Sequence, residues 1–316
     1  MRLALLSLLL FISVKALPQA AGDIFLADPT IVYSGGDYYL TGTDDTGAVQ
    51  GFSLYKSKDL RSWTNVGPIL TAGHQCWGTK GFWAPQLVSH DGQWLLLYTA
   101  NEQVAMAKAR DIIGPFVQDN VRPIDASEKN IDPFLFIDDD SKAYLYHVRF
   151  NHGNYIWCGE FDMAKGELVT GTLRRCFAAT QDWERTNDYP SDPILEGPTV
   201  VKLHGKYYFF YSANHFMSKD YAVGYAVADS PLGPWVKYPG NPILHRSILG
   251  ETGDGHGDIF KDKRGHLFYV YHVHYSDSKA TPRRTRIVAL TAKKGKDRYY
   301  TIKADKKKVI IPRVSQ

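Results

Sequence analysis

The stretch Asp132-Pro133-Phe134-Leu135-Phe136 is followed by a polar turn over residues 138–142 and by Tyr144-Leu145-Tyr146, and this pattern decides the fold. An apolar run, a turn rich in Asp and Ser, and an aromatic run together predict a β-hairpin. The pattern returns four more times, and the other hairpins open with Asp28-Pro29-Thr30-Ile31-Val32, Ala84-Pro85-Gln86-Leu87-Val88, Gly197-Pro198-Thr199-Val200-Val201 and His256-Gly257-Asp258-Ile259-Phe260. Five hairpins therefore organise the sequence.

The hairpins recur about every 57 residues, close to the blade length of kelch-like propellers. A third and a short fourth strand can be placed after most of them, and four strands per repeat is the pattern of a propeller blade. We therefore predict an all-β fold: a five-bladed β-propeller with four antiparallel strands per blade and an active site at the central channel. The alternative is a β-sandwich with irregular hairpins, which does not require the same strand opening at regular intervals.

The composition of the 316 residues suits a folded protein with a large core. Hydrophobic residues make up 44% and aromatic residues 13% of the chain, which also has 27 glycines; this favours strands and tight turns over a helical bundle. Lys and Arg number 37 against 33 Asp and Glu, so the net charge is only +4. Because binding to nucleic acid depends on an excess of basic side chains, we expect no nucleic-acid partner.

Three cysteines are too few for a disulfide framework, and an odd number leaves one thiol over. In an oxidising compartment Cys158 could pair with Cys176, with Cys76 as the remaining thiol.

The amino terminus has the pattern of a signal peptide. Met1-Arg2 precedes an apolar run over residues 3–14, and small residues suited to cleavage follow at Ala16, Ala20 and Ala21. The alternative, a membrane anchor, needs about 20 apolar residues, and this run is shorter. We therefore predict a signal peptide over residues 1–21, a single propeller domain over residues 22–316, no membrane span, and a protein exported to the periplasm or the cell exterior.

Carboxyl groups and a histidine open several of the repeats. In a propeller the first strand of each blade lines the channel, so Asp28, Asp132, Glu196 and His256 converge on one axis. A carboxyl crowded by two others resists ionisation, and acid–base chemistry needs one protonated and one ionised carboxyl. Asp-Pro is also a common turn pair, so each residue alone has a structural alternative; the matching repeat positions favour function.

The motifs resemble those of the five-bladed propellers of glycoside hydrolase family 43. The resemblance runs over nearly the whole chain after the signal peptide, in the order Ala27-Asp28-Pro29, Phe82-Trp83-Ala84-Pro85, Ile131-Asp132-Pro133-Phe134, Glu196-Gly197-Pro198 and Gly255-His256-Gly257. It implies an inverting enzyme with Asp28 as general base, Glu196 as general acid, and Asp132 as the residue that orients the acid and tunes its pKa. Inverting glycosidases hold their two working carboxyls about 6.5–9.5 Å apart to admit a water, and carboxyls on different blades can meet that separation.

The resemblance also implies residues that bind the substrate. Phe82 and Trp83 open the second blade, where an aromatic face can pack on a sugar ring; the alternative is that they are core residues. His256 lies where some family members hold a hydrated cation, with calcium the first choice of ion. The segment 282–286 resembles the stretch that sends an arginine toward the substrate and the acid. Alternation separates Arg283 from Arg284 and Arg286, and the alignment favours Arg283.

These observations predict a glycoside hydrolase that needs no organic cofactor and removes terminal pentofuranosyl or related residues from plant cell-wall polysaccharides or oligosaccharides. α-L-Arabinofuranosidase is the first choice of activity, and β-xylosidase and β-galactofuranosidase are the alternatives on the same fold. A propeller that binds glycan without cutting it is the alternative from another class.

Overall fold

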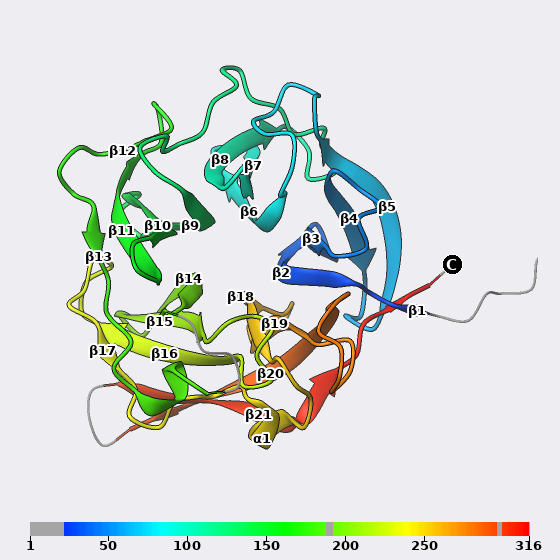
Figure 1. The fold of residues 1–316 in the computed structure, drawn as a ribbon. Helices are drawn as coiled ribbons and strands as arrows, with labels where there is room; N and C mark the ends of the chain where they lie inside the picture. The colour runs from blue at the N-terminus through cyan, green and yellow to red at the C-terminus, as the bar shows by residue number, and fades with distance from the viewer. Residues whose placement is uncertain (1–21, 188–191, 296–298, 316) are drawn as a thin grey trace, which may run out of the picture.

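The computed structural model describes residues 22–187, 192–295 and 299–315. Five sheets stand around a central axis as the blades of a propeller (Figure 1). The predicted all-β, five-bladed fold is confirmed. The predicted signal peptide, residues 1–21, lies outside the described residues.

The strands follow the chain from blade to blade. Blade 1 consists of β1 (Gly22–Asp23), β2 (Leu26–Ser34), β3 (Asp37–Asp44), β4 (Gly51–Ser57), β5 (Ser62–Thr71) and the C-terminal β22 (Arg313–Val314). Blade 2 consists of β6 (Trp83–His90), β7 (Gln93–Ala100) and β8 (Gln103–Ala109). Blade 3 consists of β9 (Asn130–Ile137), β10 (Ala143–Phe150), β11 (Asn154–Asp162), β12 (Glu167–Leu168) and β13 (Arg174–Arg175).

The last two blades are the most regular. Blade 4 consists of β14 (Leu195–Leu203), β15 (Lys206–Ala213), β16 (Ala222–Ala228) and β17 (Val236–Lys237). Blade 5 consists of β18 (Gly255–Lys261), β19 (Leu267–Val273), β20 (Arg284–Lys294) and β21 (Tyr300–Ile310). The helical elements in the described residues are the single turns η1 (Asp182–Glu184) and α1 (Arg246–Leu249).

The four strands expected in every blade are found in blades 1, 3, 4 and 5, with additional short strands in blades 1 and 3, whereas blade 2 has three strands. In blade 2 the chain after β8 makes only an isolated bridge between Lys108 and Val117. Pro115 has no N–H to donate, and the N–H of Phe116 donates to Ile69 O of blade 1 at 2.8 Å, so this segment crosses to the neighbouring blade. Blade 1 is larger because β22 pairs with both β5 and β1, which brings the two ends of the described chain together (Figure 1).

The hydrophobic core lies between the blades. Five clusters of buried residues each join two neighbouring sheets. Aromatic residues of the second strands supply much of this contact: Tyr146 packs on Phe209 between blades 3 and 4, with ring centroids 5.2 Å apart, and Phe210 packs on Tyr269 between blades 4 and 5 at 5.8 Å. The channel is therefore left to the polar residues that begin each inner strand.

The inner strand of every blade has the same irregularity near its start. A β-bulge interrupts the register of β2, β6, β9, β14 and β18. The residue at the bulge has a positive φ in each case: Asp28 (46°), Ala84 (45°), Asp132 (57°), Gly197 (59°) and His256 (35°). A positive φ is costly for residues other than glycine, and such strain persists where the surrounding structure holds it, often at functional sites.

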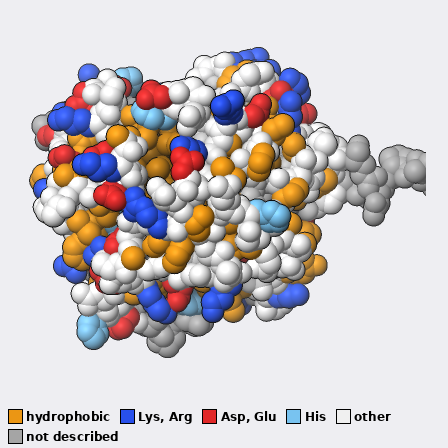
Figure 2. Space-filling model, turned by 90° about the horizontal axis from the view of Figure 1, so that it is seen from above, with side chains coloured by type: hydrophobic (Ala, Val, Ile, Leu, Met, Phe, Trp, Pro, Cys, Tyr) orange, Lys and Arg blue, Asp and Glu red, His pale blue; other side chains and the backbone are white. Residues whose placement is uncertain are grey.

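Figure 2 shows basic and acidic side chains interspersed over the face that it presents. No helix within the described residues has the length and apolar character needed to cross a membrane.

Candidate active site

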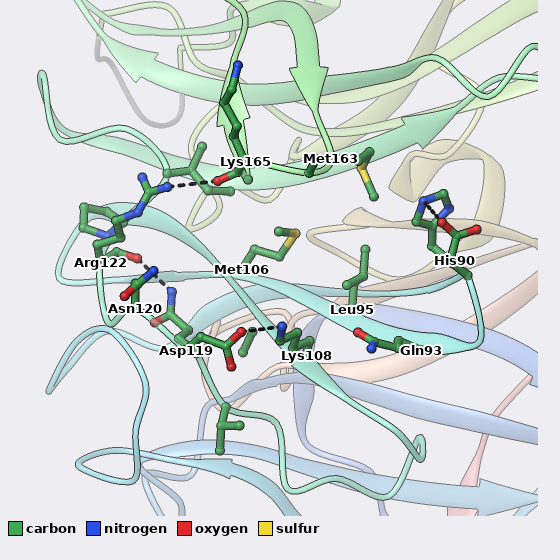
Figure 3. Close-up of a pocket in the computed structure, with 18 residues that line it drawn as sticks. His90, Gln93, Leu95, Met106, Lys108, Asp119, Asn120, Arg122, Met163 and Lys165 are labelled. Carbon is green, nitrogen blue, oxygen red and sulfur yellow. Dashed lines mark hydrogen bonds and ion pairs between the residues drawn. The ribbon is translucent and has the colours of Figure 1, made fainter.

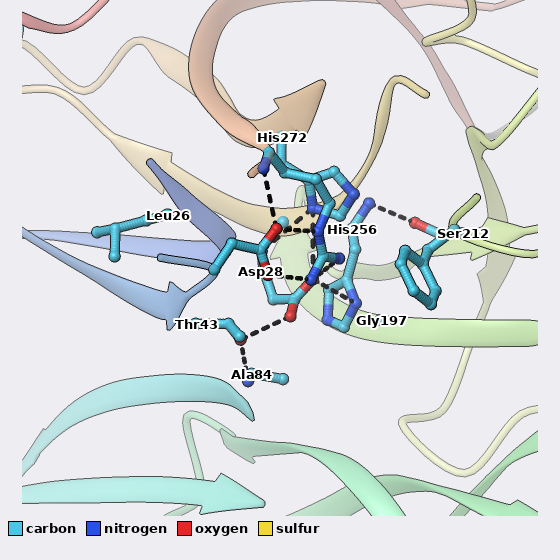
Figure 4. A network of polar contacts seen from close by, with 12 residues as sticks. Leu26, Asp28, Thr43, Ala84, Gly197, Ser212, His256 and His272 are labelled. Atoms are coloured by element: carbon cyan, nitrogen blue, oxygen red, sulfur yellow. Dashed lines mark hydrogen bonds and ion pairs between the residues drawn. The ribbon is translucent and has the colours of Figure 1, made fainter. Parts of the chain in front are cut away.

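The backbone N–H groups at the bulges donate hydrogen bonds to side chains of the preceding blade. The N–H groups of Ala84 and Asp132 donate to the hydroxyls of Thr43 and Thr99, each at 2.9 Å. That of His256 donates to Ser212 Oγ at 2.8 Å (Figure 4). Because buried N–H groups must find acceptors, these bonds hold the strained residues in place and align the blades around the axis.

Asp28, in β2, is buried among cationic and hydrogen-bonding groups (Figure 4). Its N–H donates to His272 Nδ1 at 3.2 Å, and the Thr43 hydroxyl donates to its Oδ2 at 2.6 Å. Its Oδ1 lies 3.2 Å from Arg283 Nη1 and 3.3 Å from His256 Nδ1. Burial alone would raise the pKa of Asp28, but the charge of Arg283, helped by the two histidines, holds this pKa well below its usual value. The Asp28 carboxyl is therefore ionised near neutral pH.

Asp132, in β9, departs from the repeating pattern. Its Oδ2 accepts the N–H of Gly197 at 3.1 Å, where the other blades use a side chain of the second strand. The same oxygen lies 3.8 Å from His256 Nδ1. Burial and the negative charges of Glu196 and Asp28 raise the pKa of Asp132 well above its usual value. Asp132 thus fixes the backbone next to Glu196 and affects the charge at the axis.

Glu196, in β14, has two oxygens in different surroundings. Oε1 accepts the hydroxyl of Tyr221 at 2.7 Å, and Oε2 lies 3.4 Å from Asn154 Nδ2. Burial raises the pKa of Glu196 to about 7, and the charge of Asp28 adds to the effect, although the Tyr221 and Asn154 contacts favour the ionised form. Glu196 therefore holds a proton over a pH range in which Asp28 is ionised.

Gly197 has a steric reason to be glycine. Besides its positive φ, a Cβ at this position would lie 2.7 Å from His256 Cδ2. The imidazole of His256 therefore packs directly on the backbone that follows Glu196. Burial lowers the pKa of His256, which leaves the ring neutral at pH 7.

Arg283 is the arginine that enters the site, as the alignment favoured. Its Nη1 lies 3.2 Å from Asp28 Oδ1, its Nε and Nη2 donate to the two oxygens of Asp45 at 2.7 and 2.8 Å, and its guanidinium lies 4.8 Å from the ring of Phe216. Arg284 and Arg286 instead pair with Glu251. Asp45 orients the guanidinium so that it bonds Asp28, and the positive charge of Arg283 also acts on Glu196.

The two aromatic residues at the start of blade 2 have different surroundings. Phe82 is buried between blades 1 and 2, where its ring stacks on Tyr98 with centroids 6.1 Å apart, so the core alternative describes it. Trp83 is 38% exposed and directly precedes Ala84, the bulge residue of blade 2. Of the two, only Trp83 offers a surface to a ligand.

Several residues of the site were missed from the sequence, namely Thr43, Asp45, Asn154, Tyr221 and His272. Two of them, Thr43 and His272, occupy a position that repeats in the sequence and could have been found from it. The second strands place a polar residue directly after a tyrosine at Tyr98-Thr99, Tyr146-His147, Tyr211-Ser212 and Tyr271-His272, and Thr43 has the equivalent place in blade 1. These residues mostly accept the bulge N–H groups. Asp45, Asn154 and Tyr221 lie in or beside connections between strands and have no such repeat.

The comparison with known proteins agrees with this geometry. Residues 21–296 match the family model described as glycosyl hydrolases family 43. The chain belongs to glycosyl hydrolase family 43. It is accordingly a glycoside hydrolase, which acts on O-glycosyl bonds.

Members of family 43 with solved structures share the whole fold. A structure titled endo-1,4-beta-xylanase from Bacteroides thetaiotaomicron is 38% identical, covers 94% of this chain and 99% of its own, and superposes with a TM-score of 0.87. A thermostable family-43 glycoside hydrolase is 33% identical, with 92% and 96% coverage and a TM-score of 0.80.

Curated relatives in family 43 are more distant. A beta-D-galactofuranosidase from Aspergillus niger is 25% identical over 83% of this chain and 78% of its own length. A xylan 1,3-beta-xylosidase from a Vibrio species is 28% identical over 79% of this chain. The chain spans only about half the length of that xylosidase and of two relatives named xylosidase/arabinosidase.

The structure offers few protein ligands for the axial calcium expected for some members of family 43. Within residues 22–187, 192–295 and 299–315, no group of three or more His, Cys, Asp or Glu side chains is arranged to bind a metal ion. The Nδ1 edge of His256 faces Asp28 and Asp132, which leaves the other edge as a single ligand, whereas calcium takes six to eight oxygen ligands. A hydrated ion beside His256 stays a prediction.

Cys158 and Cys176, which could pair in an oxidising compartment, have free thiols in this structure. Cys158 and Cys176 both belong to the cluster between blades 3 and 4, and Cys76 belongs to the one between blades 1 and 2. Burial raises the pKa of the Cys76 thiol and, more strongly, that of the Cys176 thiol. These thiols have the surroundings of core residues and not of nucleophiles.

A larger cavity away from the axis lacks the features of a catalytic site. It has a volume of about 520 Å³ and lies between the outer parts of blades 2 and 3 (Figure 3). Its lining includes Met106 and Met163, and its basic side chains Lys108 and Arg122 are already paired, with Asp119 at 2.5 Å and with Glu167 at 2.9 Å. Asp28 and Glu196, whose pKa values are displaced in opposite directions, instead make the axis the candidate active site.

Asp254, two residues before His256, is a buried carboxyl that does not belong to the cluster of Asp28, Asp132, Glu196 and His256 at the axis. Neither of its oxygens has a hydrogen-bond partner among the described residues. Burial, together with the charge of Glu251, raises its pKa from 3.8 to about 8. The carboxyl therefore carries a proton in the folded protein at neutral pH.

We expect Asp254→Asn to stabilise the protein at alkaline pH. Because the folded-state pKa lies above the unfolded-state value, the folded protein binds a proton that the unfolded chain has lost between about pH 4 and pH 8. Stability therefore falls as pH rises through this window and levels off above it. Urea unfolding should show the variant to be more stable by several kcal/mol at pH 9 and by much less at pH 5; a difference independent of pH would contradict this account.

Proposed function

We propose that this protein is an exported, inverting glycoside hydrolase that removes terminal α-L-arabinofuranosyl residues from plant cell-wall polysaccharides or their oligosaccharides. One observation carries the proposal: Asp28 and Glu196, on blades 1 and 4, have pKa values displaced in opposite directions at one axis. An inverting glycosidase needs this combination of an ionised base and a protonated acid. The apolar run at residues 3–14 supports export.

The proposed reaction is a single displacement. A water oxygen forms a bond to the anomeric carbon while the bond from that carbon to the leaving oxygen breaks. Asp28 takes a proton from the water, and Glu196 gives its proton to the leaving oxygen. Asp28 then releases its proton to solvent, and Glu196 takes up a proton from solvent, which restores the starting state.

The neighbouring residues keep the two carboxyls in these roles. Arg283, itself held by Asp45, stabilises the ionised form of Asp28. Asp132 positions the backbone of Gly197, next to Glu196, by accepting its N–H. Burial and the charge of Asp28 keep the proton on Glu196. No step requires an organic cofactor or a metal ion.

Terminal β-xylosyl residues are the second candidate. The structure that is 38% identical carries the name of a xylanase, and two curated relatives are named for both xylosidase and arabinosidase activity. The β-galactofuranosidase among the relatives supports a third substrate.

Aryl α-L-arabinofuranoside, β-D-xyloside and β-D-galactofuranoside test these substrates directly. We expect the arabinofuranoside to be hydrolysed with the highest kcat/KM, with release of the monosaccharide. Proton NMR during the reaction should show the inverted anomer as the first product, and a retained anomer would refute the single displacement. If all three stay intact while glycans still bind, the protein is a glycan-binding propeller and the proposal is wrong.

The pH dependence of kcat/KM should follow the two carboxyls. Catalysis requires protonated Glu196, so the rate should fall tenfold per pH unit above about pH 7 as this group ionises. On the acid side the rate should persist below pH 4, because the pKa of Asp28 lies well below its usual value. Initial rates between pH 3 and pH 9, limited to the range in which circular dichroism shows folded protein, would measure both limbs. A rate that rises between pH 7 and pH 9 would contradict the assignment of Glu196 as acid.

A further inference from the structure

The hairpin of β20 and β21 carries the excess positive charge of the protein. Residues 293–308 contain eight Lys and Arg against two Asp and Glu, a net charge of +6, whereas the whole chain has a net charge of +4. The rest of the chain is therefore slightly acidic. The exposed lysines of the hairpin within the described residues, which we call the lysine edge, are Lys293, Lys294, Lys303, Lys306, Lys307 and Lys308.

The lysine edge lies on the outside of the propeller, because β21 is the outermost strand of blade 5 (Figure 1). The register of the hairpin places Lys293 and Lys303 on the same face. Ile302, on the opposite face, is fully buried against blade 4. Beyond these residues the pairing with β20 is interrupted at residues 305–308, and this bulge presents three lysines in succession. The lysines are therefore gathered along one hairpin at the outer wall of the propeller.

Lysines on an outer strand commonly prevent it from pairing with another chain. This strand is already protected in two other ways. Its outward N–H groups at Tyr300 and Ile302 donate to the hydroxyls of Tyr208 and Tyr225 of blade 4, at 2.7 and 3.1 Å. The bulge at residues 305–308 then interrupts the rest of the edge. Six lysines are therefore more than protection of the strand requires.

Most charges of the lysine edge are not neutralised by the protein. Lys308 lies 3.5 Å from Asp305, and the other five lysines form no ion pair with any residue that the structure describes. Like charges held close together repel one another, which lowers stability unless a partner supplies negative charge. The lysine edge therefore has the charge of a surface that binds a polyanion.

We infer that the lysine edge binds an acidic polysaccharide, a chain whose sugar units carry the carboxylates of uronic acids. The choice of a polysaccharide rests on the proposed function, in which the axial site acts on cell-wall polymers. A lysine ammonium is a point charge without the bidentate geometry of arginine, so it suits carboxylates that are irregularly spaced along a flexible chain. Bound in this way, the polymer keeps the enzyme close to the chain ends that the axial site removes.

Nucleic acid is the less suitable polyanion. Proteins that bind single strands combine basic side chains with aromatic rings on which the bases stack. Tyr300 is the aromatic residue next to Lys294 in the hairpin register, but its ring is stacked on His204 with centroids 4.1 Å apart. That ring is therefore occupied.

The binding test compares polygalacturonate with the same chain after complete methyl esterification, which removes the charge and keeps the sugars. We expect the wild type to bind only the charged chain, and calorimetry should show Kd rising about tenfold in the triple variant Lys303→Gln/Lys306→Gln/Lys307→Gln. Raising the salt from about 0.05 M to about 0.3 M should weaken wild-type binding by a similar factor, because salt screens exposed charges. Replacement of the same three lysines by Arg should keep the affinity, since the charge remains.

The matched control is Lys58→Gln/Lys142→Gln/Lys165→Gln, which removes the same charge from blades 1 and 3. These side chains are 74, 66 and 72% exposed, and each already lies beside a carboxylate, at 2.6, 3.8 and 3.0 Å. Their replacement should change Kd less than twofold. A duplex DNA that binds the wild type as tightly as polygalacturonate would overturn the assignment to a polysaccharide.

Hydrolysis gives a second readout. The lysine-edge Gln variant should raise KM about tenfold for arabinan attached to polygalacturonate, with the kinetics on an aryl α-L-arabinofuranoside changed less than twofold, because the lysine edge lies away from the axis. The inference is overturned if this KM stays unchanged, if the variant binds polygalacturonate as tightly as the wild type, if the esterified chain binds equally well, or if the control variant loses as much affinity. If the wild type binds polygalacturonate through the lysine edge but hydrolyses no glycoside, the binding surface stands and the proposed function fails.

Discussion

Replacing Asp28 with Asn should lower kcat by about 10³-fold or more, even for aryl glycosides with good leaving groups. The amide cannot take a proton from the attacking water, and a good leaving group does not compensate for a weak nucleophile. The substitution also removes the negative charge that pairs with Arg283 and lies next to His256. Steady-state kinetics on a dinitrophenyl glycoside would measure the loss.

The control for this variant is Asp37→Asn. Asp37 is also a buried carboxylate of blade 1, but it pairs with Lys56 and Lys58 at 2.9 and 2.6 Å and lies outside the axial group. We expect its kcat to stay near that of the wild type, with some loss of stability. A residual activity of Asp28→Asn within tenfold of wild type, in a protein folded by circular dichroism, would show that Asp28 is not the base.

Replacing Glu196 with Gln should have an effect that depends on the leaving group. The amide cannot supply a proton, so hydrolysis of an oligosaccharide should fall by about 10³-fold, whereas a dinitrophenyl glycoside should lose less than about tenfold. The fall in kcat/KM above pH 7 should also disappear, because Glu196 is the group that titrates there. Kinetics with a series of aryl leaving groups would give the dependence as a slope.

Glu167→Gln serves as the control, since Glu167 is an outer residue of blade 3 that pairs with Arg122 at 2.9 Å. It should keep wild-type rates and the wild-type pH profile. Equal losses on all leaving groups in Glu196→Gln would assign the proton donor elsewhere, and Asp132, whose pKa is also raised, would be the next residue to test.

The fold was accessible from sequence because the propeller repeats itself. The hairpin that opens at Asp132 could be compared with four others, so an ambiguous segment in one blade was interpreted through its equivalents. The same repetition placed Asp28, Asp132 and His256 at one level of one axis, and the structure has all three at the bulge position with positive φ. The outer edges of the blades had no such support: a fourth strand was expected in every blade, yet in blade 2 the chain after β8 bonds through Phe116 to blade 1.

Contacts between blades could not be predicted from the sequence. Arg283 was expected to point toward the acid, and only the structure shows that Asp45, 238 positions away, holds its guanidinium on Asp28. Phe82 looked equally suited to a sugar or to the core, and only its packing on Phe52 and Tyr98 decides for the core. Tyr221 and Asn154 give no local sign that they meet at Glu196.

The sequence by itself determined the number of blades, the family and which carboxyls face the axis, because each of these follows from a local pattern repeated at a regular spacing. Only the tertiary structure shows why Asp28 is ionised while Glu196 keeps its proton. That difference arises from burial and from the charges within a few ångströms, and those neighbours, Arg283 for Asp28 and Tyr221 with Asn154 for Glu196, come from parts of the chain that only folding brings together.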